Sequence, residues 1–173
     1  MLTLLTSDVQ VEQWDEALML TYQVFKMLHV LGIVLFLGNI IVTGVWKYRA
    51  DLTARPQVIA FAQRLVTLTD WIFTFGGVIL ILIGGFGMAG VAGLDIATTS
   101  WLRLGLALFI ASGIIWAAIL IPIQIAQARL ARTFENGGEI PERYWRLNRR
   151  WYIWGALATV LPLLNIYVMI QKI

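Results

Sequence analysis

The stretch WIFTFGGVILILIGGFGMAGV, residues 71–91, decides the fold of this chain, because no charged side chain interrupts it. A helix needs about 20 apolar residues to cross the hydrocarbon core of a bilayer. Backbone groups cannot hydrogen-bond to lipid, so a segment that crosses the core has to satisfy them within a helix. The sequence therefore predicts a transmembrane helix here.

Three other apolar stretches have a similar length, and the composition agrees with them. The chain is 60% hydrophobic and 13% charged, whereas a soluble domain has about 45–50% apolar and about 25% charged residues. So much apolar surface cannot be hidden in one small globule. We therefore expect a single all-α domain, an antiparallel four-helix transmembrane bundle in contact with the lipid bilayer. Its domain and span boundaries are predicted at residues 1–173 and at about 22–46, 67–91, 102–128 and 149–171.

The basic residues predict the orientation, because most of them lie in the first and third connections between spans. Cytoplasmic loops are enriched in Lys and Arg, so we place both loops inside and both termini outside. The net charge of +3 then follows from topology and does not indicate nucleic acid. The residues concerned are Lys47, Arg49, Arg55 and Arg64 in the first loop, and Arg129, Arg132, Arg143, Arg146, Arg149 and Arg150 in the third.

The N-terminal segment has no Lys or Arg before Lys26, so we do not expect a cleaved signal peptide. Apolar residues recur there at spacings of three or four, which is typical of one helix face. We expect an outer amphipathic helix from about Asp8, with a frayed tail as the alternative. The face comprises Val11, Trp14, Leu18, Tyr22 and Phe25.

Small and polar residues mark the inner faces of the spans, since they let helices approach closely in lipid. The stripes are Tyr22, Lys26, His29, Gly32, Phe36, Asn39 and Thr43; then Thr67, Asp70, Thr74, Gly77, Ile81, Gly84 and Met88; then Gly105, Ser112 and Gly113; then Ala158, Pro162, Asn165 and Met169. The third helix is expected to run on to about Phe134, and the fourth to begin near Pro141, because Gly, Asn and Pro punctuate helices between them.

His29, the only histidine, is the main candidate for chemistry. An imidazole inside a membrane needs a partner or a metal. Lys26 lies one helical turn away, and Arg103 opens the third span at the same expected depth. Together they predict an anion site for haem propionates, a quinone head group or an anionic lipid. The alternatives are that both cations extend to the interface and that His29 only bonds a neighbouring helix.

Met88 and Met169 are expected near that depth, and either could be a second axial ligand. Asp70 is expected to form a structural ion pair with Arg64, Arg146 or Arg149, and Asn39 and Asn165 to bond between helices. The absence of cysteine excludes disulfides and thiolate sites. A single histidine argues against a closed zinc site and against a two-haem cytochrome.

Several short motifs suggest a family. Residues 24–32, VFKMLHVLG, resemble the Lys-x-x-His opening of small bacterial membrane proteins of the CopD-like group, which includes the HemJ-type protoporphyrinogen oxidase. Residues 69–74 (TDWIFT), 101–103 (WLR) and 122–124 (PIQ) make the chain most similar to an uncharacterised branch of predicted four-span integral membrane proteins.

The resemblance implies a haem-associated protein of the bacterial cytoplasmic (inner) membrane, with His29 at the position of the motif histidine. Arg103 lies near the place of a later functional lysine. Because arginine does not readily deprotonate, the resemblance implies a haem pocket here more than the oxidase reaction.

Our leading hypothesis is therefore a membrane protein that binds haem b near the outer face in a redox role, as a haem-dependent oxidoreductase. His29 would be the axial ligand of the iron, Lys26 and Arg103 would lie near the propionates, and Met88 would lie close by. A quinone or porphyrin ligand and a homodimer or larger membrane complex stay open as partners. The alternatives are a non-enzymatic accessory or scaffold subunit and a small transporter.

Overall fold

The computed structural model describes residues 2–173, with side chains from Asp15 onward. Within this range every regular element is a helix. The elements are α1 (Leu2–Asp51), α2 (Pro56–Thr69), the π-helical turn η1 (Asp70–Thr74), α3 (Phe75–Val91), α4 (Ser100–Ile115), the π-helical turn η2 (Trp116–Leu120), α5 (Ile121–Phe134) and α6 (Glu142–Gln171).

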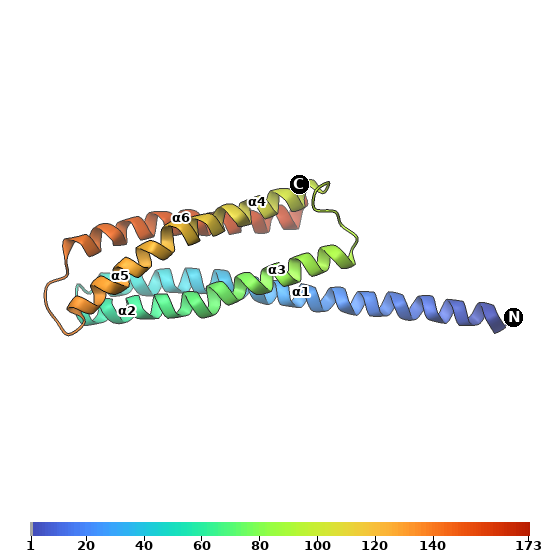
Figure 1. Ribbon diagram of the computed structural model, residues 1–173, viewed down its shortest axis with the longest axis horizontal. Coiled ribbons are helices and arrows are strands. Elements are labelled where there is room, and N and C mark those ends of the chain that lie inside the picture. The colour runs from blue at the N-terminus through green and yellow to red at the C-terminus, as the bar shows by residue number, and fades with distance from the viewer. Residues whose placement is uncertain (1) are drawn as a thin grey trace.

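These elements join into four long rods that run up and down side by side (Figure 1). Each rod is long and apolar enough to cross a membrane, and each contains one of the four spans that the sequence predicts. The rods are Asp15–Asp51, Pro56–Val91, Ser100–Phe134 and Glu142–Gln171. This arrangement confirms the expected all-α four-helix membrane bundle. The helical bounds after the third span and before the fourth, Phe134 and Glu142, agree with the prediction.

The two ends of the bundle differ in charge. We call the end with the loops at residues 52–55 and 135–141 the basic end, and the end with the loop at residues 92–99 the opposite end. The chain termini lie toward the opposite end, where α1 extends beyond the other helices (Figure 1). The helical backbone is continuous from Leu2 through the first span. The side chains of Val11 and Trp14 lie outside the described residues.

The helices associate in two pairs, α1 with α3 and α4 with α6. Glycine brings the first pair close: a Cβ added at Gly77 would lie 2.8 Å from the backbone oxygen of Gly32, and one added at Gly84 would lie 2.5 Å from the backbone nitrogen of His29. The two pairs are farther from each other: within the described part no Cα atom of α4 lies within 8 Å of one in α1 or α3.

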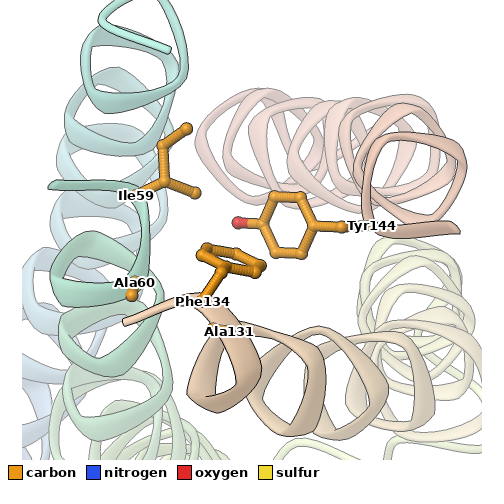
Figure 2. Packing of buried hydrophobic residues seen from close by; sticks show 5 residues of the cluster. All are labelled: Ile59, Ala60, Ala131, Phe134 and Tyr144. Carbon is orange, nitrogen blue, oxygen red and sulfur yellow. The ribbon is translucent and has the colours of Figure 1, made fainter. Parts of the chain in front are cut away.

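The pairs join at the basic end, where α2 packs on α5 and α6 closes over both. Figure 2 shows the apolar core there, built from Ile59, Ala60, Ala131, Phe134 and Tyr144, all nearly or fully buried. The rings of Phe134 and Tyr144 meet edge to face, with centroids 5.3 Å apart. This edge-to-face packing contributes beyond the buried area alone.

Most positions of the expected inner stripes are buried or half-buried from His29 and Thr67 onward. Three positions are wrong: Tyr22, Lys26 and Gly113 are exposed. Beside Lys26, Phe25 takes the position against Gly84 and Gly87 of α3, and beside Gly113, Ser112 takes the inner position. Asn165 bonds no other helix, and its buried Oδ1 has no protein partner within the described residues.

Every rod presents large apolar side chains to its surroundings. Val34, Ile72, Ile114 and Leu164, one from each span, are exposed by half or more. Such a surface is stable in lipid and not in water. The bundle is therefore in contact with the lipid bilayer.

Candidate ligand-binding site

Asp70 is the centre of a buried polar cluster that connects three helical rods. Its Oδ1 accepts hydrogen bonds from Asn39 Nδ2 at 2.9 Å and from Thr74 Oγ1 at 3.0 Å. Its Oδ2 accepts one from Gln124 Nε2. Asn39 Nδ2 also donates to Thr74 Oγ1. A carboxylate buried away from water needs such donors, and here α1, η1 and α5 supply them.

The expected ion pair of Asp70 with an arginine is wrong. Arg64 pairs with Glu135, and Arg146 pairs with Glu142 one turn earlier on α6. The reason is position: Asp70 faces the inside of the bundle and is 7% exposed, while these arginines extend from its surface. The expected bond between helices at Asn39 is confirmed.

Two of the rods depart from regular α-helix near Asp70, each through one π-helical turn. Asp70 begins the π-helical turn η1, and the second π-helical turn, η2, ends four residues before Gln124. Pro122 explains η2, because its ring clashes with the carbonyl four residues earlier and it has no N–H to bond there. Turns of this kind occur frequently at functional sites.

Beside Asp70 lies a cavity of about 570 Å³, within the range of small-molecule sites. Its walls come from α1, η1, α4, η2, α5 and α6, and they are mainly apolar. Five aromatic side chains line it: Phe36, Tyr48, Trp116, Trp151 and Tyr152. The cavity is open on one side, where the exposed side chains of Ile41, Val45 and Val160 on α1 and α6 form its rim. An apolar pocket with a few convergent polar groups is the usual form of a ligand site.

Two of these aromatic residues have an indole N–H without a hydrogen-bond acceptor among the described residues. The indole nitrogens Nε1 of Trp116 and Trp151 are buried, and among the described side chains and backbone no acceptor lies within hydrogen-bond distance. Trp151 is 8% exposed. Buried donors are nearly always paired in folded proteins, but these two nitrogens have almost no accessible surface, so they lie behind the cavity wall and do not face its open space.

A second polar network lies between the cavity and the basic end. Lys47, with no exposed surface, pairs with Asp51 at 3.4 Å and donates to Tyr144 Oη at 2.9 Å. Asp51 Oδ2 also accepts from Asn148 Nδ2 at 2.7 Å and from Tyr152 Oη at 2.8 Å. Tyr152 thus connects this network with the cavity wall.

Sequence reasoning assigned Lys47 to topology alone and missed this network. One signal was available: Lys47 and Asp51 are four residues apart, the spacing of neighbours on one helix face. The aromatic and amide partners come from α6, about a hundred residues later in the chain. No pattern in a single sequence indicates such a pairing.

Of the residues of the predicted haem site, Lys26 and His29 lie one turn apart on α1, Met88 lies one turn beyond Gly84 on the paired helix α3, and Arg103 lies on α4. His29 is half-buried in the α1–α3 contact, with Nδ1 2.8 Å from the backbone oxygen of Ile81. Lys26 is exposed, and Met88 is half-buried on α3. Arg103 is exposed on α4. In the described part of the chain no Cα atom of α4 lies within 8 Å of one in α1 or α3, and α4 meets α1 through the rings of Phe109 and Phe36, with centroids 6.4 Å apart. None of the four lines the cavity.

This architecture defines an integral membrane protein of four spans. Residues 23–173 match the family model described as predicted integral membrane protein (DUF2269). The match covers most of the chain, which therefore belongs to this family. No curated protein and no solved structure matches the chain.

Proposed function

We propose that this protein binds a lipid-soluble small molecule in the cavity beside Asp70, in the manner of a small transporter. The observation that carries the proposal is the juxtaposition of apolar and aromatic walls with the Asp70 carboxylate. An amphipathic molecule fits such a lining, because its body contacts the walls and its head group bonds the polar atoms.

The helix irregularities favour transport over a purely structural role. Membrane transporters commonly build their sites where helices are interrupted, because the freed backbone groups face a cavity there. Here η1 supplies Asp70 and Thr74, while η2 supplies Trp116.

The glycines of the cavity wall provide a sharp test. A Cβ added at Gly155, in the cavity wall, meets nothing within 4 Å. Gly155→Leu should therefore fill the cavity without disturbing the fold. Gly113→Leu is the matched control, because Gly113 is equally open but faces away from the cavity.

Binding would be measured by calorimetry on protein in phosphatidylcholine nanodiscs, with 1-adamantylammonium, 1-adamantanol and adamantane-1-carboxylate as probes of one shape. We expect at least one probe to bind wild type and Gly113→Leu, with binding lost in Gly155→Leu. If no probe binds wild type better than it binds Gly155→Leu, the proposal is wrong.

Haem binding at His29 is a second candidate, favoured by the bond of its imidazole. A backbone carbonyl only accepts, so Nδ1 carries a proton; in a neutral imidazole Nε2 then has the free lone pair that a metal needs. Histidines that bind a metal are commonly fixed by such a bond. His29 thus fits an axial ligand and Lys26 a propionate partner, whereas Arg103 lies on α4, which in the described part has no Cα atom within 8 Å of one in α1. Bound haem would supply electron transfer.

An absorbance spectrum tests this candidate. After expression with ample haem, purified wild type should show a Soret band that His29→Ala lacks. A wild-type protein without that band would exclude haem binding. We further propose the bacterial cytoplasmic membrane as the location, with the basic end inside, on the evidence of the charge distribution and the CopD-like resemblance.

A further inference from the structure

The charges around the cavity indicate what kind of molecule it takes. Among the residues whose side chains the structure describes, Asp70 is the only acidic one in the lining, and none of the lining residues is Lys, Arg or His. We infer that the ligand is a lipid-soluble organic cation whose positive charge is balanced by Asp70. This inference rests on the proposed function and names its substrate class.

No basic group of the described chain compensates Asp70. Its side chain forms none of the ion pairs between residues 15 and 173. Lys47, the basic residue two helical turns beyond Asn39 on α1, is already paired with Asp51. An ionisable group within a span generally has a partner or marks the path of a substrate or ion. The protein supplies no such partner for Asp70, so a cationic ligand is the natural one.

The hydrogen bonds of Asp70 leave room for that ligand. An ionised carboxylate has about four acceptor positions, and the protein fills two on Oδ1 and one on Oδ2. The three donors, from Asn39, Thr74 and Gln124, are neutral, so they hold the carboxylate in place without cancelling its charge. One position on Oδ2 stays open to an ammonium N–H.

The aromatic walls suit a cation as well. A positive charge is attracted to the face of Trp or Tyr within about 6 Å. The ring of Trp151 already makes such a cation–π contact within the protein, because Lys47 Nζ lies 5.9 Å from its centroid. Trp116, Tyr48 and Tyr152 line the same cavity. An apolar body with an ammonium group would meet rings and carboxylate together.

The three adamantane probes test the charge, because they share one body and carry a positive, neutral or negative group. We expect wild type to bind 1-adamantylammonium about tenfold or more tightly than 1-adamantanol, since a desolvated cation–π contact alone gives about that factor. Adamantane-1-carboxylate should bind weakest. In Asp70→Asn the preference for the ammonium over the alcohol should fall markedly, to what the aromatic rings alone contribute, while Asp70→Glu should keep the full preference.

The outcomes separate this inference from the proposed function. If ammonium and alcohol bind wild type equally and Gly155→Leu abolishes both, the cavity is a ligand site but its ligand is not a cation. If adamantane-1-carboxylate binds best, the inferred positive charge of the ligand is wrong. If no probe depends on the cavity, both proposals fail. The comparison in wild type decides the charge even if Asp70→Asn does not fold.

Discussion

A buried ion pair near the basic end, between Lys47 and Asp51, connects two helices of the bundle. Lys47 is fully buried, and its charge is balanced by the Asp51 carboxylate with help from Tyr144 Oη. A buried ion pair need not add net stability, but removing one partner leaves an uncompensated charge. The pair therefore makes α1 dependent on α6, which supplies the remaining hydrogen bonds.

Asp51→Asn should destabilise the protein by about 3–5 kcal/mol, because it leaves Lys47 buried without an anion. The double variant Lys47→Met/Asp51→Asn should recover much of the loss. The free energy of unfolding can be measured by titration with sodium dodecyl sulfate, followed by tryptophan fluorescence.

The control is the exposed pair of Arg146 with Glu142, whose side chains are 65% and 88% exposed. Arg146→Met should change stability by about 0–1 kcal/mol, since water screens such pairs. An Asp51→Asn variant as stable as Arg146→Met would show that Lys47 finds another partner or loses its charge.

At the scale of elements, the α1–α3 pair depends on glycine. Without a hydrophobic drive between helices in lipid, close backbone contact is a main source of association. A Cβ at Gly84 would lie 2.5 Å both from the backbone nitrogen of His29 and from the backbone oxygen of Phe25. Since both are backbone atoms, the helices would have to move apart.

Gly84→Ala should therefore destabilise the bundle by about 1–3 kcal/mol, the usual cost of overpacking. Gly76→Ala is the matched control, because a Cβ there meets nothing within 4 Å; alanine should be neutral or favourable at that site through helix propensity. Thermal unfolding of both variants in one lipid mixture gives the comparison. Equal stability of the two would contradict the close contact.

At the scale of the whole molecule, the bundle is asymmetric along its axis. The buried polar groups and the cavity lie in the part toward the basic end, where all four rods pack together. Toward the opposite end the two helix pairs stay apart, and His29 takes part in a helix contact. The haem site that the sequence predicts lies at the opposite end, whereas the cavity beside Asp70 lies nearer the basic end.

The orientation of this asymmetric molecule can be measured directly, because the natural chain has no cysteine. A single cysteine at Asn136, in the basic-end loop, should react with a membrane-impermeant maleimide only after the cells are opened. Thr98→Cys, in the opposite loop, should react on intact spheroplasts with the outer membrane removed. The reverse pattern would overturn the positive-inside assignment.

The sequence alone predicted the membrane class, the number of spans and most inner faces, and particular residues show why. Gly77 and Gly84 are seven residues apart, two helical turns on one face, so local periodicity reveals their shared role. The Asp70 site was not predictable in the same way. Its partners Asn39 and Gln124 are 31 and 54 residues away, and no local pattern indicates which rods meet.

The sequence by itself determined that this chain crosses a membrane four times as helices, because lipid accepts only long apolar segments with satisfied backbones. Only the tertiary structure decided which polar residues share a space. Asp70 lines the cavity rather than pairing with an arginine because the packing of α2 on α5 turns it inward, toward Gln124. Lys47 is buried because α6 covers it. Both outcomes depend on contacts between distant segments, which hydropathy and spacing do not encode.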